Sequence, residues 1–250
     1  IFKMNTSAVA SSKATILQGK YEVKPIRTKE EVANVINLYL EEAIIHNPFA
    51  RVSIGHEHKE IFFNLFMKIS DAVVEDKLSY YLEDMETKEL VGGGIIVDRC
   101  SQLDGNDVAA DKSLPLKIRA RNKMYGLANE SLIQLIPFSN KRGQVAELFF
   151  AVMSGPKGNQ HLFKDFYKVA VKVIKERNFE YYSGEATNPY TVAFYSRSKN
   201  NVASLFLSFE DFEFEGEKPF ANIDFGPIWT KKPGMFAFIA KNEDFVQAKL

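Results

Sequence analysis

The stretch that most constrains the fold is residues 144–153, QVAELFFAVM, which is almost continuously apolar. A short apolar run of this kind is typical of a β-strand that helices bury on both faces. A turn with glycine and proline follows at residues 154–158, and then a helical pattern with apolar residues on one face over 160–175. The sequence therefore predicts an α/β (α+β) fold in which a central strand leads directly into a helix.

The remaining elements follow from their periodicity. Alternation predicts strands at residues 21–27, 78–86, 90–99, 179–183, 202–213 and 234–241. Spacings of three and four residues predict helices at 29–47, 57–75, 115–135 and 189–198, with a polar loop at 102–112. Three successive glycines at 92–94 indicate that another part of the chain packs very close to their strand.

Composition indicates an ordinary globular chain of 250 residues, 46% of them hydrophobic and 26% charged, with one large domain or two small ones. We expect a flexible tail over residues 1–20, with Met4 as the natural start, and a single domain over 21–250. The 32 basic and 32 acidic residues cancel, which predicts neither a nucleic-acid nor an anionic-membrane partner. No apolar run is long enough to span a bilayer.

Cysteine and histidine usage bears on metals and location. With one cysteine, Cys100, no internal disulfide forms, and the four histidines lack the spacing of zinc ligands. We therefore expect no metal and a cytoplasmic protein. Because no acidic residue precedes Glu22, a mitochondrial presequence is the alternative for the start of the chain.

Glu147 is the single charge in the apolar stretch. Burying a carboxylate costs free energy unless the group is paired, protonated or open to a cleft. A carboxylate at the floor of a cleft can take the proton of an attacking amine, directly or through a water molecule. The alternative is that Glu147 pairs with a buried lysine or arginine, or lies at the wet end of its strand.

Two further segments suit an anion. Residues 157–161, KGNQH, lie at a helix N-terminus, where unpaired N–H groups and the helix dipole favour a phosphate or pyrophosphate. The alternative there is a tight turn. The helix at 115–135 carries four basic residues that either attract an anion or form a solvated face, the default interpretation: Lys117, Arg119, Arg121 and Lys123.

These segments together carry a resemblance. Residues 146–154, with Lys157, Gly158 and His161 after them, resemble motif A of the Gcn5-related N-acetyltransferases (GNAT family), especially its histone acetyltransferase form. Residues 188–198, NPYTVAFYSRS, resemble motif B, with Thr191 where alanine is usual. The order of elements over 21–241 is similar too. The resemblance implies the GNAT fold, a mixed, mostly antiparallel sheet flanked by helices.

The resemblance also implies acetyl-CoA as co-substrate and a small-molecule or peptide amine as acceptor. In the family the central strand bulges and parts from its neighbour, which frees backbone groups for the pantetheine arm. Here those groups belong to Phe149, Phe150, Ala151, Val152 and Met153. The pyrophosphate would lie on the amides of Lys157, Gly158, Asn159, Gln160 and His161, and Asn188 would contact the CoA arm.

Two residues take catalytic positions by this resemblance. Glu147 matches the general base, and Tyr195 matches the residue that protonates the departing thiolate; an interior tyrosine is the alternative for Tyr195. The phosphate loop lacks the family's first basic or amide residue and its last glycine. A catalytically silent protein, acting as a CoA sensor or an interaction subunit, is therefore the alternative function.

Residues 47–49, NPF, resemble the Glu-Pro-Leu segment of the invertebrate arylalkylamine N-acetyltransferases, which implies that Asn47 and Phe49 contact substrate. The family's glutamate is Asn47 here, so proton removal would depend on Glu147 or a chain of water molecules. The alternative is that Asn47 and Pro48 only end a helix. The fold's edge strand near 202–213 can pair with a second chain, so the protein is a monomer or a homodimer.

Overall fold

The computed structural model describes residues 14–101, 105–135, 141–154, 160–225, 229 and 232–242. Its centre is a sheet with the strand order β1-β2-β3-β4-β5-β6-β8-β7. Only β5 and β6 pair in parallel within it; the other neighbours are antiparallel, as expected. The strands are β1 (Thr15–Leu17), β2 (Tyr21–Pro25), β3 (Tyr80–Asp84), β4 (Leu90–Asp98), β5 (Val145–Met153), β6 (Tyr181–Ala186), β7 (Asn201–Ser208) and β8 (Gly234–Lys241).

Helices cover this sheet, and their bounds match most of the expected ones. They are α1 (Lys29–His46), α2 (Pro48–Ser53), α3 (Lys59–Met67), α4 (Ser70–Asp76), α5 (Gly105–Ala110), α6 (Leu116–Leu135), α7 (Gln160–Glu176) and α8 (Pro189–Ser196), with a 3₁₀ turn η1 (Arg99–Ser101). Thr28 and Glu31 form the capping box that starts α1. Asn188 caps α8 ahead of a proline, as the sequence predicts.

Three segments differ from expectation. Residues 14–20, placed in the tail, form β1 and the turn into β2, and residues 1–13 lie outside the described part. The single helix expected at 57–75 is two helices, because Lys68 and Ile69 donate to carbonyls three residues back, which makes a tighter turn. The expected loop at 102–112 contains α5. The two-residue interruption at 68–69 leaves the apolar spacing intact, so periodicity does not reveal it.

The glycines of β4 show how the helices are layered. Successive strand residues point to opposite faces. A Cβ on Gly93 would meet Val35 of α1, whereas a Cβ on Gly94 would meet Phe166 of α7. The sheet therefore has an α1 face, which also carries α2, α3 and α6, and an α7 face, which also carries α8. The close approach predicted at these glycines is confirmed.

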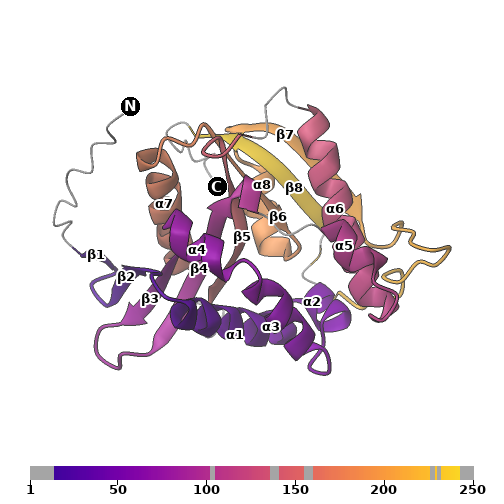
Figure 1. Cartoon of the computed structure of the whole chain (residues 1–250), viewed down its shortest axis with the longest axis horizontal. Coiled ribbons are helices and arrows are strands. Elements are labelled where there is room, and N and C mark those ends of the chain that lie inside the picture. The colour runs from indigo at the N-terminus through magenta and orange to yellow at the C-terminus, as the bar shows by residue number, and fades with distance from the viewer. Residues whose placement is uncertain are drawn as a thin grey trace.

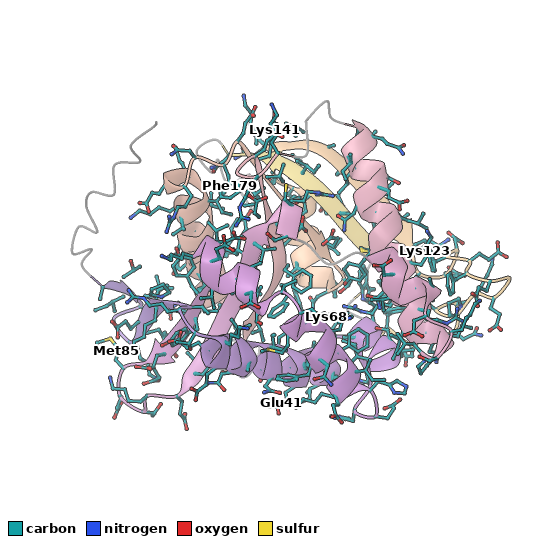
Figure 2. All side chains as sticks on the ribbon, viewed as in Figure 1. Glu41, Lys68, Met85, Lys123, Lys141 and Phe179 are labelled. Atoms are coloured by element: carbon teal, nitrogen blue, oxygen red, sulfur yellow. The ribbon has the colours of Figure 1, made fainter. Side chains whose placement is uncertain are left out.

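Figure 1 shows this arrangement, with α7 and α1 separated by the strands and α6 running beside β7 and β8. Glu41, on α1, and Lys141, just before β5, project from opposite edges of the molecule in Figure 2. The sheet's middle strands, β4, β5 and β6, lie between the two helical layers, so any site formed there is accessible to side chains from both.

Gly93→Ala is expected to lower the free energy of unfolding by about 1–3 kcal/mol. The added methyl would stand 2.7 Å from Cγ1 of Val35, a branched side chain held between α1 and the sheet. Urea denaturation of Gly93→Ala, Val35→Ala and the double variant measures the effect. The double variant should lose less stability than the sum of the two single losses. Simple additivity would contradict a contact between these positions.

Candidate functional site

Strands β5 and β6 are paired for only half of their length. Val145 to Leu148 align with residues 181–184, and the pairing ends there. Opposite β4, the register shifts at the same point, because Ile96 aligns with Leu148 and Ile95 with Phe150, which leaves Phe149 as a bulge. Beyond Leu148, β5 stays with β4 while β6 stays with β8. The expected bulge and parting are confirmed.

A cavity of about 1040 Å³ lies at this parting. On the α7 face its walls include Phe163, Phe166, Tyr167, Ala170 and Tyr195. On the α1 face they include Tyr39, Phe66, Arg121, Tyr125 and Glu185, with Phe225 and Trp229 beyond. Because one cavity receives side chains from both faces, it passes through the sheet where the two strands separate. Two molecules entering from opposite sides would meet at this point.

The residues expected to hold the CoA arm divide into two groups. Those that line the cavity are Phe149, Phe150, Ala151, Val152, Met153 and Asn188. Asn188 also caps α8, because its side-chain oxygen accepts from the N–H of Tyr190 at 2.9 Å. In the expected phosphate loop, Gln160 begins α7 and His161 is exposed on its first turn. Lys157, Gly158 and Asn159 lie outside the described residues.

Tyr195 is an interior tyrosine and a cavity wall at once. Helix α8 holds it 8% exposed, with its ring stacked on Phe238 at 4.5 Å and edge-on to Tyr167. Its hydroxyl makes no hydrogen bond to the described residues. Burial raises the pKa of Tyr195 well above 10, so the hydroxyl keeps its proton at neutral pH. The hydroxyl is therefore present in its protonated form in the cavity wall, and its raised pKa makes it a weaker acid than an exposed tyrosine.

Glu147 is completely buried and lies behind the cavity wall instead of on it. It accepts a hydrogen bond from the hydroxyl of Ser183, its register partner on β6. Arg99 Nη1 lies 3.4 Å from the Glu147 carboxylate and donates to Ser183 Oγ at 3.0 Å, while its Nη2 donates to Asn129 Oδ1 at 3.0 Å. The alternative of a buried arginine partner is thus the arrangement found.

Glu185 is the cavity-facing acid that the sequence analysis missed. It stands two residues after Ser183 on β6 and so shares its face of the sheet. Oε1 of Glu147 and Oε1 of Glu185 are buried without a donor in the described part of the chain, and the two side chains lie within hydrogen-bonding reach. Two carboxylates in this arrangement repel each other, whereas one shared proton gives each oxygen a partner.

The environment of Glu185 favours that shared proton. Burial, and after it the negative charge of Glu147, raises the pKa of Glu185 well above its usual value. The positive charges of Arg99 and Arg121 oppose this shift without cancelling it. Burial therefore favours the protonated form of Glu185, whose carboxyl would then be able to donate a hydrogen bond to the carboxylate of Glu147.

Comparison of the whole chain with known proteins identifies the fold. No protein-family model and no curated protein matches it. The chain is similar to the C-terminal condensation domain of Ebony in complex with beta-alanyl-dopamine (TM-score 0.65, 16% identity) and to arylalkylamine N-acetyltransferase 2 from Aedes aegypti (TM-score 0.65, 12% identity). It is also similar to an agmatine N-acetyltransferase (TM-score 0.61, 11% identity). The chain has the GNAT fold.

These alignments span nearly all of each partner. They cover 88–89% of this chain and 99% of each of the three structures. The GNAT fold expected from residues 144–161 and 188–198 is thereby confirmed, although the identities of 11–16% carry no residue roles across. The roles must be argued from this chain's own cavity.

Within the GNAT fold, the segment at 47–49 divides between the cavity and the core. Asn47 ends α1, caps α2 and donates from Nδ2 to Thr187 Oγ1 at 3.0 Å, and both residues line the cavity. Phe49 is 1% exposed and stacks on Phe209 at 4.1 Å. It does not line the cavity, so its expected contact with substrate is replaced by a core contact under α2.

Within the described ranges of this GNAT-fold chain, no set of three or more His, Cys, Asp or Glu side chains is grouped so that it could bind a metal ion. None of the helices there combines the length and apolar character that a membrane crossing requires.

Proposed function

We propose that the chain is an acetyl-CoA-dependent N-acetyltransferase that acetylates a primary amine. One observation carries the proposal: a single cavity passes through the parting of β5 and β6, with a proton donor, Tyr195, on one face and a proton acceptor, Glu185, on the other. The similar structures include proteins named as arylalkylamine and agmatine N-acetyltransferases. Their shared fold is consistent with transfer to an amine.

The edge of β5 suits the donor. Residues 149–153 remain paired with β4, and their other edge faces the parting where β6 has left. A strand edge without a neighbour offers N–H and C=O groups to an extended amide such as the pantetheine arm. The residues that would hold acetyl-CoA are Phe149, Phe150, Ala151, Val152, Met153 and Asn188, with the pyrophosphate at the start of α7. Acetyl-CoA supplies the activated acetyl thioester.

The carboxyl pair suits the acceptor. A protonated amine must lose a proton before its lone pair can attack the thioester carbonyl. In the proposed step the amine gives its proton to Glu185, and the proton already shared by the pair moves onto Glu147. Glu185 is the catalytic residue because it faces the cavity; Glu147, expected from the sequence as the base, acts through it. Arg99 and Ser183 hold Glu147 in place.

The acetyl group then moves from the thioester sulfur to the amine nitrogen. The amine nitrogen bonds to the acetyl carbon, and the nitrogen of the tetrahedral intermediate, which carries a positive charge after the attack, gives its second proton to solvent. The C–S bond breaks as the intermediate collapses, and the carboxyl pair returns the proton that it took from the amine to solvent. A backbone N–H at the Phe149 bulge would face the oxyanion, a form of preorganised electrostatic stabilisation. Tyr195 gives its proton to the thiolate and recovers one from solvent. Holding both substrates in one cavity adds the advantage of proximity.

Titration calorimetry with acetyl-CoA and free CoA, followed by a thiol-release assay over a panel of amines, tests the proposal. We expect saturable binding in the micromolar range and amine-dependent release of CoA. Binding without release for any amine would instead support the silent CoA sensor, for which the altered phosphate loop is the motive. Absence of binding at millimolar CoA would leave an interaction subunit and overturn the proposal.

Tyr195→Phe is expected to lower kcat by about 100-fold with little change in the Kd of acetyl-CoA, because only the departing thiolate needs the hydroxyl. Tyr182→Phe is the matched control: Tyr182 is also buried and packs against Phe238, but it does not line the cavity. Steady-state kinetics and calorimetry of both variants give the comparison. Equal turnover of wild type and Tyr195→Phe would make that hydroxyl structural.

A further inference from the structure

Arg121 is a buried cation that makes no direct contact with a carboxylate in the described part of the chain. It is 6% exposed on α6 and lines the cavity on the α1 face; Lys123, two residues further, marks this part of the helix in Figure 2. Its guanidinium lies over the rings of Phe62, at 4.9 Å, and Tyr125, at 4.6 Å. It forms no hydrogen bond or ion pair with any described residue, and its Nε is buried without an acceptor.

Two other buried arginines show what is missing. Arg119, two residues earlier on α6, is 7% exposed and makes a bidentate pair with Glu215, with both N–O distances at 2.7 Å. Arg99 has Glu147, Ser183 and Asn129. Burying a charge without such partners costs free energy, so an arginine of this kind in a cavity wall indicates a binding function. The expected solvated face is therefore wrong for Arg119 and Arg121.

The other charged groups of the cavity wall do not supply the missing anion. Glu42 lies one turn before His46 on α1, with 3.3 Å between Oε2 of Glu42 and Nε2 of His46. Arg51 donates to two backbone carbonyls at the end of α1, and Asp224 is exposed. Glu147 lies 3.4 Å from Arg99, and Glu185 makes no hydrogen bond or ion pair with Arg121 in the described part of the chain. None of these groups supplies a carboxylate in contact with Arg121.

Resting on the proposed function, we propose that Arg121 binds the carboxylate of the acceptor and that the acceptor is an amino acid, with its amine at Glu185. The planar guanidinium matches a carboxylate with two parallel hydrogen bonds. One guanidinium that no carboxylate of the described chain contacts matches a monoanion, which favours a carboxylate over a phosphate dianion. The amino acid's own ammonium then meets the negative charge of the carboxyl pair.

The two ends lie close enough for one small molecule. The charges of Arg121 and Glu185 both act on Tyr125, whose pKa burial raises to about 12, so the three side chains are neighbours. Phe225 and Trp229 stand in a T-shaped contact, with centroids 6.1 Å apart, on the same cavity wall. An amino acid with an aromatic side chain would fill this part of the cavity.

The position of Arg121 favours the acceptor as the source of the anion. The groups expected to meet the phosphates of CoA lie at the start of α7, on the opposite face of the sheet from α6. A guanidinium on the α1 face is thus separated from them by the strands. A carboxylate carried by the acyl group or by CoA remains a distinct outcome of the test.

The test compares acceptors that differ only in the carboxylate: tyrosine with tyramine, tryptophan with tryptamine, and β-alanine with ethylamine. Wild type should prefer the amino acid in at least one pair by about 10- to 100-fold in kcat/KM, the range of a charged hydrogen-bonded contact. Arg121→Met should remove that preference and leave the carboxylate-free amine unchanged or better. Calorimetric binding of the same pairs in the presence of CoA should follow the same order.

Arg119→Met is the matched control, an equally buried arginine on the same helix that does not line the cavity. It should lower the Tm, because Glu215 loses its bidentate partner and keeps only Lys112, and it should keep the wild-type acceptor preference. Arg121→Met should keep or raise the Tm, because it removes an unpaired charge and fills similar space. This opposite sign in Tm separates loss of recognition from loss of folding.

Three results would overturn the inference. Wild type that binds each amine as tightly as its amino acid has no carboxylate site. If Arg121→Met weakens the binding of free CoA and affects both members of each acceptor pair equally, the anion that Arg121 binds belongs to CoA. If Arg121→Met affects only acyl donors whose acyl group carries a carboxylate, the anion belongs to the acyl chain. If no amine is acetylated at all, carboxylate-dependent binding still supports the site, and the proposed function alone fails.

Discussion

Glu185→Gln is expected to lower the kcat/KM of acetyl transfer by about 10²- to 10⁴-fold at neutral pH. Glutamine keeps the shape of the side chain but cannot take a proton, so a protonated amine in the cavity would have no base within reach. Glu185 faces the cavity, whereas Glu147 is completely buried behind it. Direct transfer to Glu147 is therefore closed to the amine once Glu185 cannot pass the proton on.

The pH profile makes this prediction specific. The amine loses its proton to water as pH rises toward its own pKa, so the ratio of wild-type to Glu185→Gln rates should shrink at high pH. Steady-state kinetics from pH 6 to 10 with one amine gives both curves. A constant ratio over this range would mean that Glu185 stabilises the site without acting as the base.

Glu147→Gln is the matched control, and it should behave differently. The negative charge of Glu147 raises the pKa of Glu185, so its removal lowers that pKa. Glu185 would then be ionised at lower pH and could act as a base alone, so the acid limb of the profile should move to lower pH. Partial activity with a shifted limb is the expected result. An unshifted limb would contradict coupling between the two carboxyls.

The difference between Glu147 and Glu185 shows how much of the candidate site can be predicted from the sequence. Glu147 stands out because it interrupts an apolar run, and its burial follows from the run itself. Glu185 follows Gly184 at the end of a strand that the pattern places at 179–183, so it falls outside the predicted element. Extending that strand by two residues would have put Glu185 on the face of Ser183, beside Glu147.

Helix α6 shows a second limit, which concerns long-range packing. Basic residues along a helix usually mark a solvated face. Here α6 packs against β7 and β8 on one side and closes the cavity on the other, so Arg119 and Arg121 are buried. Their environments come from residues about 60 to 100 positions away, such as Glu215 and Glu185. Local spacing contains no trace of such partners.

Asn188 and the central strand were predictable for the opposite reason. An asparagine ahead of proline caps a helix by its own backbone geometry, and an almost continuous apolar run is typical of a strand covered on both faces. The parting of β5 from β6 was expected only through resemblance, because Leu148 and Phe149 are equally apolar and nothing local distinguishes the last paired residue from the first unpaired one. Elements follow from local rules, whereas the opening follows from the whole sheet.

Arg99→Met is expected to lower the free energy of unfolding by about 3–5 kcal/mol. Arg99 is 6% exposed and joins three elements, because it contacts Glu147 on β5, Ser183 on β6 and Asn129 on α6. Methionine fills much of the space but leaves the charge of the carboxyl pair without a cation beside it. Urea denaturation with linear extrapolation gives the value.

Two further variants decide whether the loss comes from the charge. The double variant Arg99→Met with Glu147→Gln removes both charges of the Arg99–Glu147 contact. It should recover a large part of the lost free energy of unfolding, because a neutral glutamine at position 147 needs no counterion. Arg142→Met, which breaks an exposed pair with Asp76 at 2.7 Å, should cost less than about 1 kcal/mol. If Arg99→Met costs no more than Arg142→Met, the contact of Arg99 with Glu147 adds no more stability than an ion pair at the surface, and the prediction is wrong. The double variant tests the cause separately, because a stability equal to that of Arg99→Met alone would mean that the loss comes from packing and not from the charge of Glu147.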